Sequence, residues 1–453
     1  MKKMSMNRGT KLLVLMGVLV LVLGAFFLLM KLGIDDANSS AGANTQVVFS
    51  LDPAKVTKFG WKYTDEAYFT KTENGWVNDA DSTFPVNATV LEQMITGLVK
   101  VTSSKTIEKP ADMSQYGLVN PYCAIKVTVD GKDYNLAIGD QNQHNGLVYF
   151  SNGDGNVYMV SSSIVDYFNF GSEKVLLMET IPNLSTLISL KVEHGDKTYE
   201  ITKQVDSDKA YSNHYMWFWN DTVTLDNELT EEMLKVVYDL EWKGCANHNA
   251  SDFAEYGLDN PTVVTVTYQK DKTFVLHLGE KTDKGIYARL ADSKMVCYVG
   301  YGIADTLRNL ASNELLPDEA LALEWGKVSS AEIILGDKTY TLLHEEVPDP
   351  NGCATGSYVW KYDGKEVAAD KVFDKLEALS FSNYRTEPLK EGAKEQIRFV
   401  FYVTAGNVDT VELVIYDYNS TECQVTLNGE PTITVVRTDV DKLVTAVKEL
   451  FAA

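Results

Sequence analysis

A six-residue phrase occurs twice in the chain, as YGLVNP at 116–121 and as YGLDNP at 256–261. A second phrase recurs at almost the same distance, because GDKTYEITK begins at Gly195 and GDKTYTLLH begins at Gly336. Self-similarity at a fixed period is the sequence signature of a supersecondary unit used several times. The repeat therefore constrains the fold more than any other feature, and every other segment can be placed relative to it.

Each repeat contains a tryptophan-bearing segment followed by a helical pattern. Trp219 and Trp360 both lie 20 residues after a tyrosine of the GDKTY phrase, and Trp76 occupies the corresponding place in the first repeat. Thr230, followed by two glutamates, suits a helix start. Apolar residues recur at helical spacing in the first two repeats. The three predicted helical segments are NATVLEQMITGLVKV from Asn87, TEEMLKVVYDLEW from Thr230 and AADKVFDKLEALSF from Ala368.

Short alternating runs follow each helical pattern and predict β-hairpins. AIKVTVDGKDYNLAIGD from Ala124 and VVTVTYQKDKTFVLHLGE from Val263 alternate around polar turns. The third repeat keeps its strand patterns but has YRTEPLKEGAKEQIRFVFYV from Tyr384 where the YGL phrase would fall. We expect an α+β fold with three repeated modules of antiparallel β-hairpins, each with one or two packed helices. The predicted modules span 46–181, 182–322 and 323–453, the third being degenerate.

The repeated phrase is interpreted as a structural motif that joins a helical turn to a strand. Glycine at its second position suits a left-handed C′ residue that ends the turn, and the following leucine packs back on that turn. The proline prevents the helix from resuming and favours extended geometry at the preceding asparagine. The residues of this structural repeat motif are Tyr116, Gly117, Leu118, Asn120 and Pro121, and Tyr256, Gly257, Leu258, Asn260 and Pro261.

The amino-terminal segment predicts membrane anchoring. Residues 12–30 carry no charge and are long enough to span most of a bilayer as a helix. Positive charges precede this run and Asp35 and Asp36 follow it, which places the amino terminus in the cytoplasm. We expect a cytoplasmic tail (1–11), a transmembrane signal anchor (12–31) and a flexible linker (32–45) at the bacterial cytoplasmic membrane, with the modules outside. A cleaved signal peptide, processed near SSAGA at 39–43, is the alternative.

Charge and cysteine usage exclude several classes of protein. The net charge is −22, and no basic stripe offsets it, so we expect no nucleic-acid partner. The five cysteines are scattered singly without a C-x-x-C pair, which argues against a zinc ribbon, a dithiol motif or a disulfide framework. Buried small hydrophobic residues are the simplest interpretation of most of these cysteines.

The ordered set of motifs resembles a known bacterial family. A tryptophan-bearing strand, an amphipathic helix, YGL-x-NP, a strand ending in IGD or LGE, and then VYMV or CYV follow one another over most of 60–320. This order is similar to that of the bacterial family of domain of unknown function 4340. The resemblance implies an extracytoplasmic, membrane-tethered protein that associates with an ABC-type transport system, through a permease or auxiliary envelope subunits. It implies no biochemical activity.

No catalytic constellation stands out, so we expect no enzyme activity, cofactor or metal. Nucleotide-binding, nucleophile-elbow and metalloprotease motifs do not occur in the sequence. Cys245 and His248 could form half of a metal site, but no complement is indicated. Residues 152–156 (NGDGN) imitate the start of a calcium loop, yet the sixth and twelfth positions hold Val157 and Ser163. A hairpin turn is the better interpretation of that stretch.

The segment YSNHYMWFWND at 211–221 concentrates aromatic residues. Core packing between modules is one interpretation, and an exposed platform for a carbohydrate or a partner is the other. The candidate binding surface consists of Tyr211, Tyr215, Trp217 and Trp219.

Three functions remain open from the sequence. The first is a single-pass, membrane-anchored extracytoplasmic protein acting as a non-enzymatic binding or scaffold component of an ABC-type transport system. The second is an extracytoplasmic envelope enzyme that hydrolyses glycans or peptides, with a site between modules. The third is a solute-binding protein, which usually needs two α/β lobes around a hinge.

Overall fold

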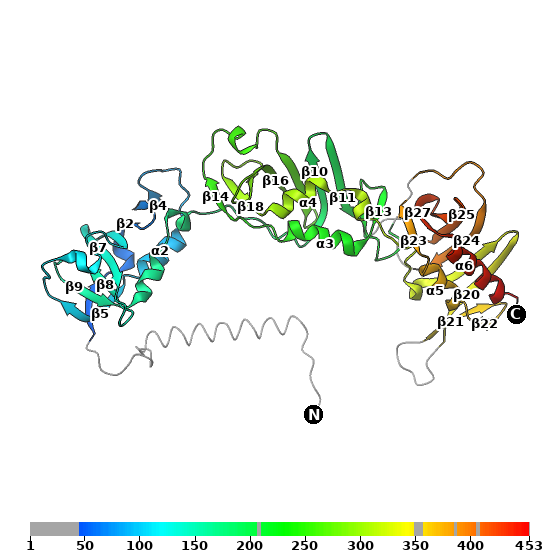
Figure 1. Cartoon of the computed structure of the whole chain (residues 1–453), viewed down its shortest axis with the longest axis horizontal. Helices are drawn as coiled ribbons and strands as arrows, with labels where there is room; N and C mark the ends of the chain where they lie inside the picture. Colours follow the sequence, from blue (N-terminus) through cyan, green and yellow to red (C-terminus); the bar gives the residue numbers. More distant parts are fainter. Residues whose placement is uncertain (1–44, 206–209, 348–356, 385–386, 405–407, 453) are drawn as a thin grey trace, which may run out of the picture. The chain divides into compact units, whose positions relative to one another are not determined.

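The computed structural model describes residues 45–205, 210–347, 357–384, 387–404 and 408–452. The chain divides into two compact units, 1–177 and 178–453 (Figure 1). The proposed tail, transmembrane anchor and most of the linker lie outside the described residues. The module boundaries themselves stay a prediction.

Unit 1 contains one nine-stranded antiparallel sheet with the order β1-β5-β9-β8-β7-β6-β2-β3-β4. Helix α2 (Ala88–Thr96) begins after the cap residue Asn87, whose side chain accepts a hydrogen bond from the Val90 amide. Leu91 and Ile95 of this helix pack against Trp61, Phe69 and Ile125 of the sheet. The strands are β1 (Gln46–Ser50), β2 (Val56–Lys62), β3 (Glu66–Thr72), β4 (Gly75–Asn78), β5 (Lys100–Ile107), β6 (Cys123–Val129), β7 (Lys132–Gln141), β8 (Val148–Ser151) and β9 (Val157–Val160).

The second sheet has the order β13-β12-β11-β10-β15-β16-β17-β18-β14. Leu234 of helix α3 (Asn227–Tyr238) and Leu307 of helix α4 (Tyr301–Asn309) pack against Val192 and Leu276 on one sheet face (Figure 1). The strands are β10 (Leu187–His194), β11 (Lys197–Lys203), β12 (Trp217–Trp219), β13 (Val223–Leu225), β14 (Gly244–Asn247), β15 (Thr262–Tyr268), β16 (Lys272–Lys281), β17 (Ile286–Leu290) and β18 (Val296–Val299).

The third sheet, also in unit 2, has the order β22-β21-β20-β19-β24-β25-β26-β27-β23. Phe373 of helix α5 (Asp370–Glu377) and Leu443 of helix α6 (Arg437–Leu450) pack on Ile333 and Phe401. The strands are β19 (Val328–Leu335), β20 (Lys338–Val347), β21 (Ser357–Tyr362), β22 (Lys365–Val367), β23 (Phe381–Tyr384), β24 (Glu395–Val403), β25 (Thr410–Asp417), β26 (Glu422–Leu427) and β27 (Glu430–Val436).

The three sheets share one topology. A three-strand meander (β2–β4, β10–β12 or β19–β21) leads through a helix to a strand at the far edge (β5, β14 or β23). A four-strand meander (β6–β9, β15–β18 or β24–β27) then fills the sheet between them. The first sheet adds β1 at the far edge, whereas the other two add β13 or β22 at the near edge. The third repeat therefore keeps the arrangement although its YGL phrase is missing.

The expected fold class, α+β with an amino-terminal transmembrane helix, is wrong for the part of the chain that the structure describes. Antiparallel sheet dominates it, and the helices are few and short, the longest described one having 14 residues. No described helix is long and apolar enough to cross a membrane. The helical patterns in the sequence are real but brief, because one or two short helices suffice to cover one face of a sheet.

Two local predictions are also corrected. Helix α3 begins at Asn227, not at Thr230, because the Asp226 side chain caps it by accepting a hydrogen bond from the Leu229 amide. Trp217, and not Trp219, corresponds to Trp360, as shown below by the cross-strand pairs. The approach loop between β11 and β12 differs in length from its counterpart between β20 and β21, so counting residues from the tyrosine misplaced the register.

Candidate functional site

The YGL phrase forms the same turn in both units. Gly117 has φ 67° and ψ 21°, and Gly257 has φ 63° and ψ 30°, both in the left-handed region. The Gly117 amide donates to the Ser114 carbonyl at 3.0 Å, and the Leu118 amide donates to the Met113 carbonyl at 3.3 Å. Gly257 and Leu258 make the equivalent bonds. This pair of bonds is the Schellman motif, so the capping geometry expected from the sequence is present.

The turn docks on the glycine of the IGD or LGE strand. A Cβ on Gly139 would lie 2.1 Å from the Tyr116 carbonyl oxygen, and a Cβ on Gly279 would lie 2.1 Å from the Tyr256 carbonyl oxygen. Real Cβ atoms do not approach an oxygen so closely, so each strand needs glycine there. The sequence showed the constant spacing of these glycines, but it did not reveal that the two motifs touch.

The other residues of the phrase also serve packing. The Tyr116 ring makes an edge contact with Tyr149 at 4.9 Å, and Tyr256 makes the same contact with Tyr287 at 5.0 Å. Leu258 is buried. Leu118 is half-buried, the asparagines Asn120 and Asn260 are exposed, and the prolines Pro121 and Pro261 are half-buried. The motif joins a helical turn to a sheet.

A second repeated contact was missed by sequence reasoning. Lys71 lies opposite Trp76, Lys203 opposite Trp217, and His344 opposite Trp360 on neighbouring strands. In the second sheet, Glu231 of α3 accepts hydrogen bonds from the indole Nε1 of Trp217 and from Lys203 Nζ, both at 3.1 Å. Glu92 of α2 accepts the corresponding bonds from the indole of Trp76 at 3.3 Å and from Lys71 at 3.4 Å. A strand tryptophan, a strand lysine and a helix glutamate thus fix α2 and α3 to their sheets, whereas the third sheet has His344 in place of the lysine.

The aromatic segment that was a candidate binding surface is largely internal. Tyr211 and Tyr215 are buried in the core of the third sheet, and Trp217 is buried in the core of the second. Trp219 is half-buried and stacks on Tyr199 with 4.4 Å between ring centroids. Burial of the first three side chains removes them from the surface that a partner could contact.

Tyr211 and Tyr215 instead form a joint between the two sheets of unit 2. The Tyr215 hydroxyl donates to the Glu319 carboxylate. Burial raises the pKa of Tyr211 and that of Tyr215 well above the ordinary value for tyrosine. In return, Tyr384 of the third sheet packs on the second core, and its hydroxyl donates to the Leu316 carbonyl at 3.0 Å. Each sheet therefore has tyrosine of its neighbour packed in or against its core.

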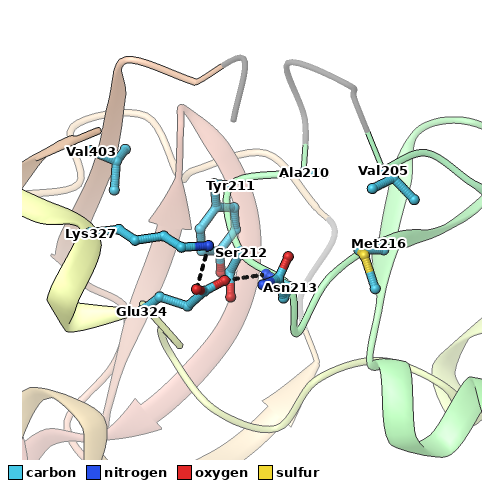
Figure 2. A pocket seen from close by; sticks show the side chains of 9 residues that line it. All are labelled: Val205, Ala210, Tyr211, Ser212, Asn213, Met216, Glu324, Lys327 and Val403. Atoms are coloured by element: carbon cyan, nitrogen blue, oxygen red, sulfur yellow. Dashed lines mark hydrogen bonds and ion pairs between the residues drawn. The ribbon is translucent and has the colours of Figure 1, made fainter. Parts of the chain in front are cut away.

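A small cavity lies at this joint (Figure 2). The Glu324 carboxylate accepts from the Asn213 amide at 3.2 Å and pairs with Lys327 at 2.5 Å, and the hydrogen bond from Lys327 holds the pKa of Glu324 below its usual range. The cavity measures about 50 Å³. That volume admits a few water molecules and is far below that of typical small-molecule sites, which begin at about 300 Å³.

The candidate metal and calcium residues have local roles. Asp154 accepts from the Tyr158 hydroxyl at 2.5 Å and from the Asn156 amide at 2.9 Å, which closes the turn between β8 and β9. Cys245 lies in β14 opposite Cys297 of β18 rather than in a ligand cluster with His248. Within the described ranges, no group of three or more histidine, cysteine or acidic side chains could hold a metal ion.

A larger hollow lies on the outer face of the first sheet, away from α2. Tyr68, Gly60, Lys126 and Asn135 lie side by side across strands β3, β2, β6 and β7. The Tyr68 ring covers Gly60, whose Cβ would lie 2.1 Å from the ring, and Lys126 Nζ is 4.8 Å from the ring centroid. The hollow measures about 320 Å³ and is lined by Lys58, Phe59, Tyr68, Phe69, Asp79, Lys126, Val127, Thr128, Asp133, Tyr134 and Asn135.

The neighbouring residues on this face are polar, and some of them form hydrogen bonds with one another. The Thr128 hydroxyl donates to Asp133 at 2.6 Å, and the Thr70 hydroxyl donates to Asp79 at 2.7 Å. Burial and a hydrogen bond to Glu66 raise the pKa of Tyr68. The second sheet has Glu200 in place of Tyr68, and the third has Thr341. The hollow with its aromatic ring and two lysines is therefore a feature of the first sheet.

The fold defines a tandem-repeat protein of antiparallel sheets, each with short helices on one face. Its repeated motifs fix architecture, whereas the hollow of about 320 Å³ is confined to the first sheet. The sequence profile of the family described as Domain of unknown function (DUF4340) matches residues 76–216 and 217–396, which together are more than half of the chain. The chain belongs to this family. The matched segments start at Trp76 and Trp217, the two tryptophans that pair with a strand lysine. No curated protein and no solved structure matches the chain.

Proposed function

We propose that this protein is a non-enzymatic binding or scaffold component of the bacterial cell envelope. The apolar segment 12–30 would hold it at the cytoplasmic membrane, with the three sheets outside. Its partner would be a permease or auxiliary subunit of an ABC-type transport system, as the family resemblance implies. The acidic net charge of −22 supports a protein partner over nucleic acid.

The proposal rests on the outer face of the first sheet. Its hollow of about 320 Å³ combines an aromatic ring, two lysines and several hydrogen-bonding side chains on rigid strands. A half-buried tyrosine surrounded by polar groups is typical of residues that anchor protein interfaces, since the ring provides area at low entropic cost. No reactive cluster accompanies it among the described residues that line the hollow.

Co-purification tests the proposal. The full chain would be affinity-purified from detergent-solubilised membranes, and its companions would be identified by mass spectrometry. We expect permease and ATPase subunits with the wild type, and their loss with the double variant Tyr68→Ala and Lys126→Ala. Glu200→Ala is the matched control, because Glu200 occupies the place of Tyr68 in the second sheet.

Two results would count against the proposal in different ways. Recovery of no transporter subunit with the wild type would remove the proposed partner. Equal recovery with the double variant would leave the partner in place but exclude the first sheet's outer face as the binding surface. Circular dichroism of the variants would show that loss of binding does not reflect unfolding.

A further inference from the structure

Two cysteines that are far apart in the sequence lie opposite each other in the second sheet. Cys245 of the edge strand β14 pairs with Cys297 of β18 in the antiparallel register. Directly opposed residues of antiparallel strands point to the same face, with Cα atoms about 4.5–5.5 Å apart. Disulfides need Cα separations of about 4.4–6.8 Å, so the backbone already satisfies the main geometric requirement.

The two cysteines differ in accessibility. Cys297 is 1% exposed, whereas Cys245 is half-buried. A hydrogen bond from Cys297 lowers the pKa of the Cys245 thiol, while the same bond, burial and the Glu179 carboxylate raise the pKa of Cys297. Cys245 is thus the more accessible and the more readily ionised of the two, which is the arrangement that thiol–disulfide exchange requires.

The edge strand of the second sheet is short. β14 has only four residues and pairs with β18 through an irregular register between Cys245 and Asn247. The corresponding strand of the first sheet, β5, has eight residues and is not at the edge, because β1 pairs with it. Tyr158, which occupies the place of Cys297 in the first sheet, faces Thr106. The edge strand β23 of the third sheet also has four residues, but it pairs Phe381 with Val435, so the opposed cysteines belong to the second sheet among the described sheets.

We propose that Cys245 and Cys297 form an intramolecular disulfide that fastens β14 to β18. The oxidant is a disulfide donor, either a small-molecule disulfide such as oxidised glutathione or a thiol oxidase. The Cys245 thiolate attacks one donor sulfur and releases the first donor thiol. The Cys297 thiol then loses its proton and attacks Sγ of Cys245, which releases the second donor thiol. Two protein thiols are oxidised, and one donor disulfide is reduced to two thiols.

Peptide mapping of the full chain tests this bond. The protein would be purified in detergent without reductant, equilibrated with oxidised glutathione, denatured in the presence of iodoacetamide and digested. We expect a linked pair of peptides containing Cys245 and Cys297, with two hydrogen atoms fewer than the sum of the free peptides. Cys245→Ser should abolish this species. Cys123→Ser and Cys423→Ser, at buried cysteines in other sheets, should leave it unchanged.

Thermal unfolding of the wild type provides a second readout of the bond, and Cys245→Ser is its control. Reduction with dithiothreitol should lower the thermal unfolding temperature of the wild type, and it should not change that of Cys245→Ser. Single alkylation of both cysteines after oxidation would overturn the proposal. So would a Cys245–glutathione adduct that never closes, or a linkage of Cys245 to another cysteine. The measurement concerns one bond in the isolated chain, so its outcome is independent of the proposed transport partner.

Discussion

At the residue scale, the glycines of the repeated motifs have distinct physical tasks. Gly117 and Gly257 provide a left-handed backbone that ends a helical turn. Gly139 and Gly279 have no such backbone requirement, and they are needed because a carbonyl oxygen lies where a Cβ would be. Close backbone approach of this kind depends on the tertiary contact between turn and strand, which explains why it was not foreseen.

Alanine substitution should affect stability differently at two glycines of the second module, because only one of them is closely approached by a backbone oxygen. Gly279→Ala should lower the free energy of unfolding by about 3 kcal/mol, because the new methyl group meets the Tyr256 carbonyl and the backbone must shift. Gly302→Ala in helix α4 meets no atom within 4 Å. It should be neutral or stabilising by up to about 1 kcal/mol, since alanine reduces the entropy of the unfolded chain. Urea unfolding of both variants measures the contrast, and equal effects would contradict the contact.

Glu231 predicts a pH-dependent contribution to stability. Burial raises the pKa of Glu231, but hydrogen bonds from Tyr238, Lys203 and Trp217 together lower it below the ordinary value of 4.5. A carboxylate with a depressed pKa in the folded state stabilises the protein above the unfolded-state pKa, and this contribution disappears as the pH falls through the folded-state pKa. Glu231→Gln should therefore be less stable than the wild type at pH 7, and the difference should shrink below pH 4.5. Thermal unfolding from pH 7 to pH 3 measures it, and a difference that stays constant would refute this role.

At the element scale, short helices are placed by their caps and by polar contacts with strands. The sequence pattern of α3 was recognised, but its start was predicted three residues too late, because Thr230 resembles a cap residue in isolation. In the structure Asp226 caps the helix, and Thr230 is buried with an Oγ1 that has no hydrogen-bond partner in the described structure. Which of two suitable residues caps a helix depends on where the preceding strand β13 ends.

Substitutions at the two candidate cap residues should change the stability of the protein in opposite directions. Asp226→Ala should destabilise the second module by about 1 kcal/mol, because the Leu229 amide loses its acceptor. Thr230→Val should be stabilising by about 1 kcal/mol, since it replaces an unsatisfied buried hydroxyl with a methyl group of similar shape. Chemical denaturation distinguishes them. If Thr230→Val proved the more damaging, the assigned cap would be incorrect.

At the scale of the whole molecule, unit 2 is held together by an exchange of tyrosines between its two sheets. Tyr211 and Tyr215 enter the third core, and Tyr384 packs on the second. An aromatic-rich segment between modules was visible in the sequence, and both of its interpretations, core packing and exposed platform, used the same residues. Only the fold decided between them, because exposure depends on whether a neighbouring sheet covers the segment.

The tyrosine joint predicts coupled unfolding of the two sheets. Tyr215→Ala should destabilise unit 2 by about 3–5 kcal/mol through the cavity it leaves, and it should separate the opening of the third sheet from that of the second. Tyr215→Phe keeps the ring and loses the bond to Glu319, so it should cost about 1–2 kcal/mol without uncoupling the sheets. Hydrogen exchange of peptides from β15–β18 and β24–β27, read by mass spectrometry, measures both effects.

The exposed tyrosine pair of unit 1 is a suitable control for the joint. Tyr122, 42% exposed, donates to the Tyr63 hydroxyl at 3.2 Å. Tyr122→Phe should therefore change hydrogen exchange in neither sheet of unit 2. Unchanged coupling in Tyr215→Ala would mean that other contacts hold the two sheets together.

By itself, the sequence determined the repeated architecture, the family, the hairpin strands and the capped YGL turn. These features depend on local preferences: alternation of side chains, left-handed glycine, and the restrictions of proline. The tertiary structure decided the dominance of β-sheet, the partners of Trp76 and Trp217, the burial of Tyr211 and Tyr215, and the opposition of Cys245 and Cys297. Those features join residues distant in the chain, and strand order and register, which no local pattern encodes, bring them together.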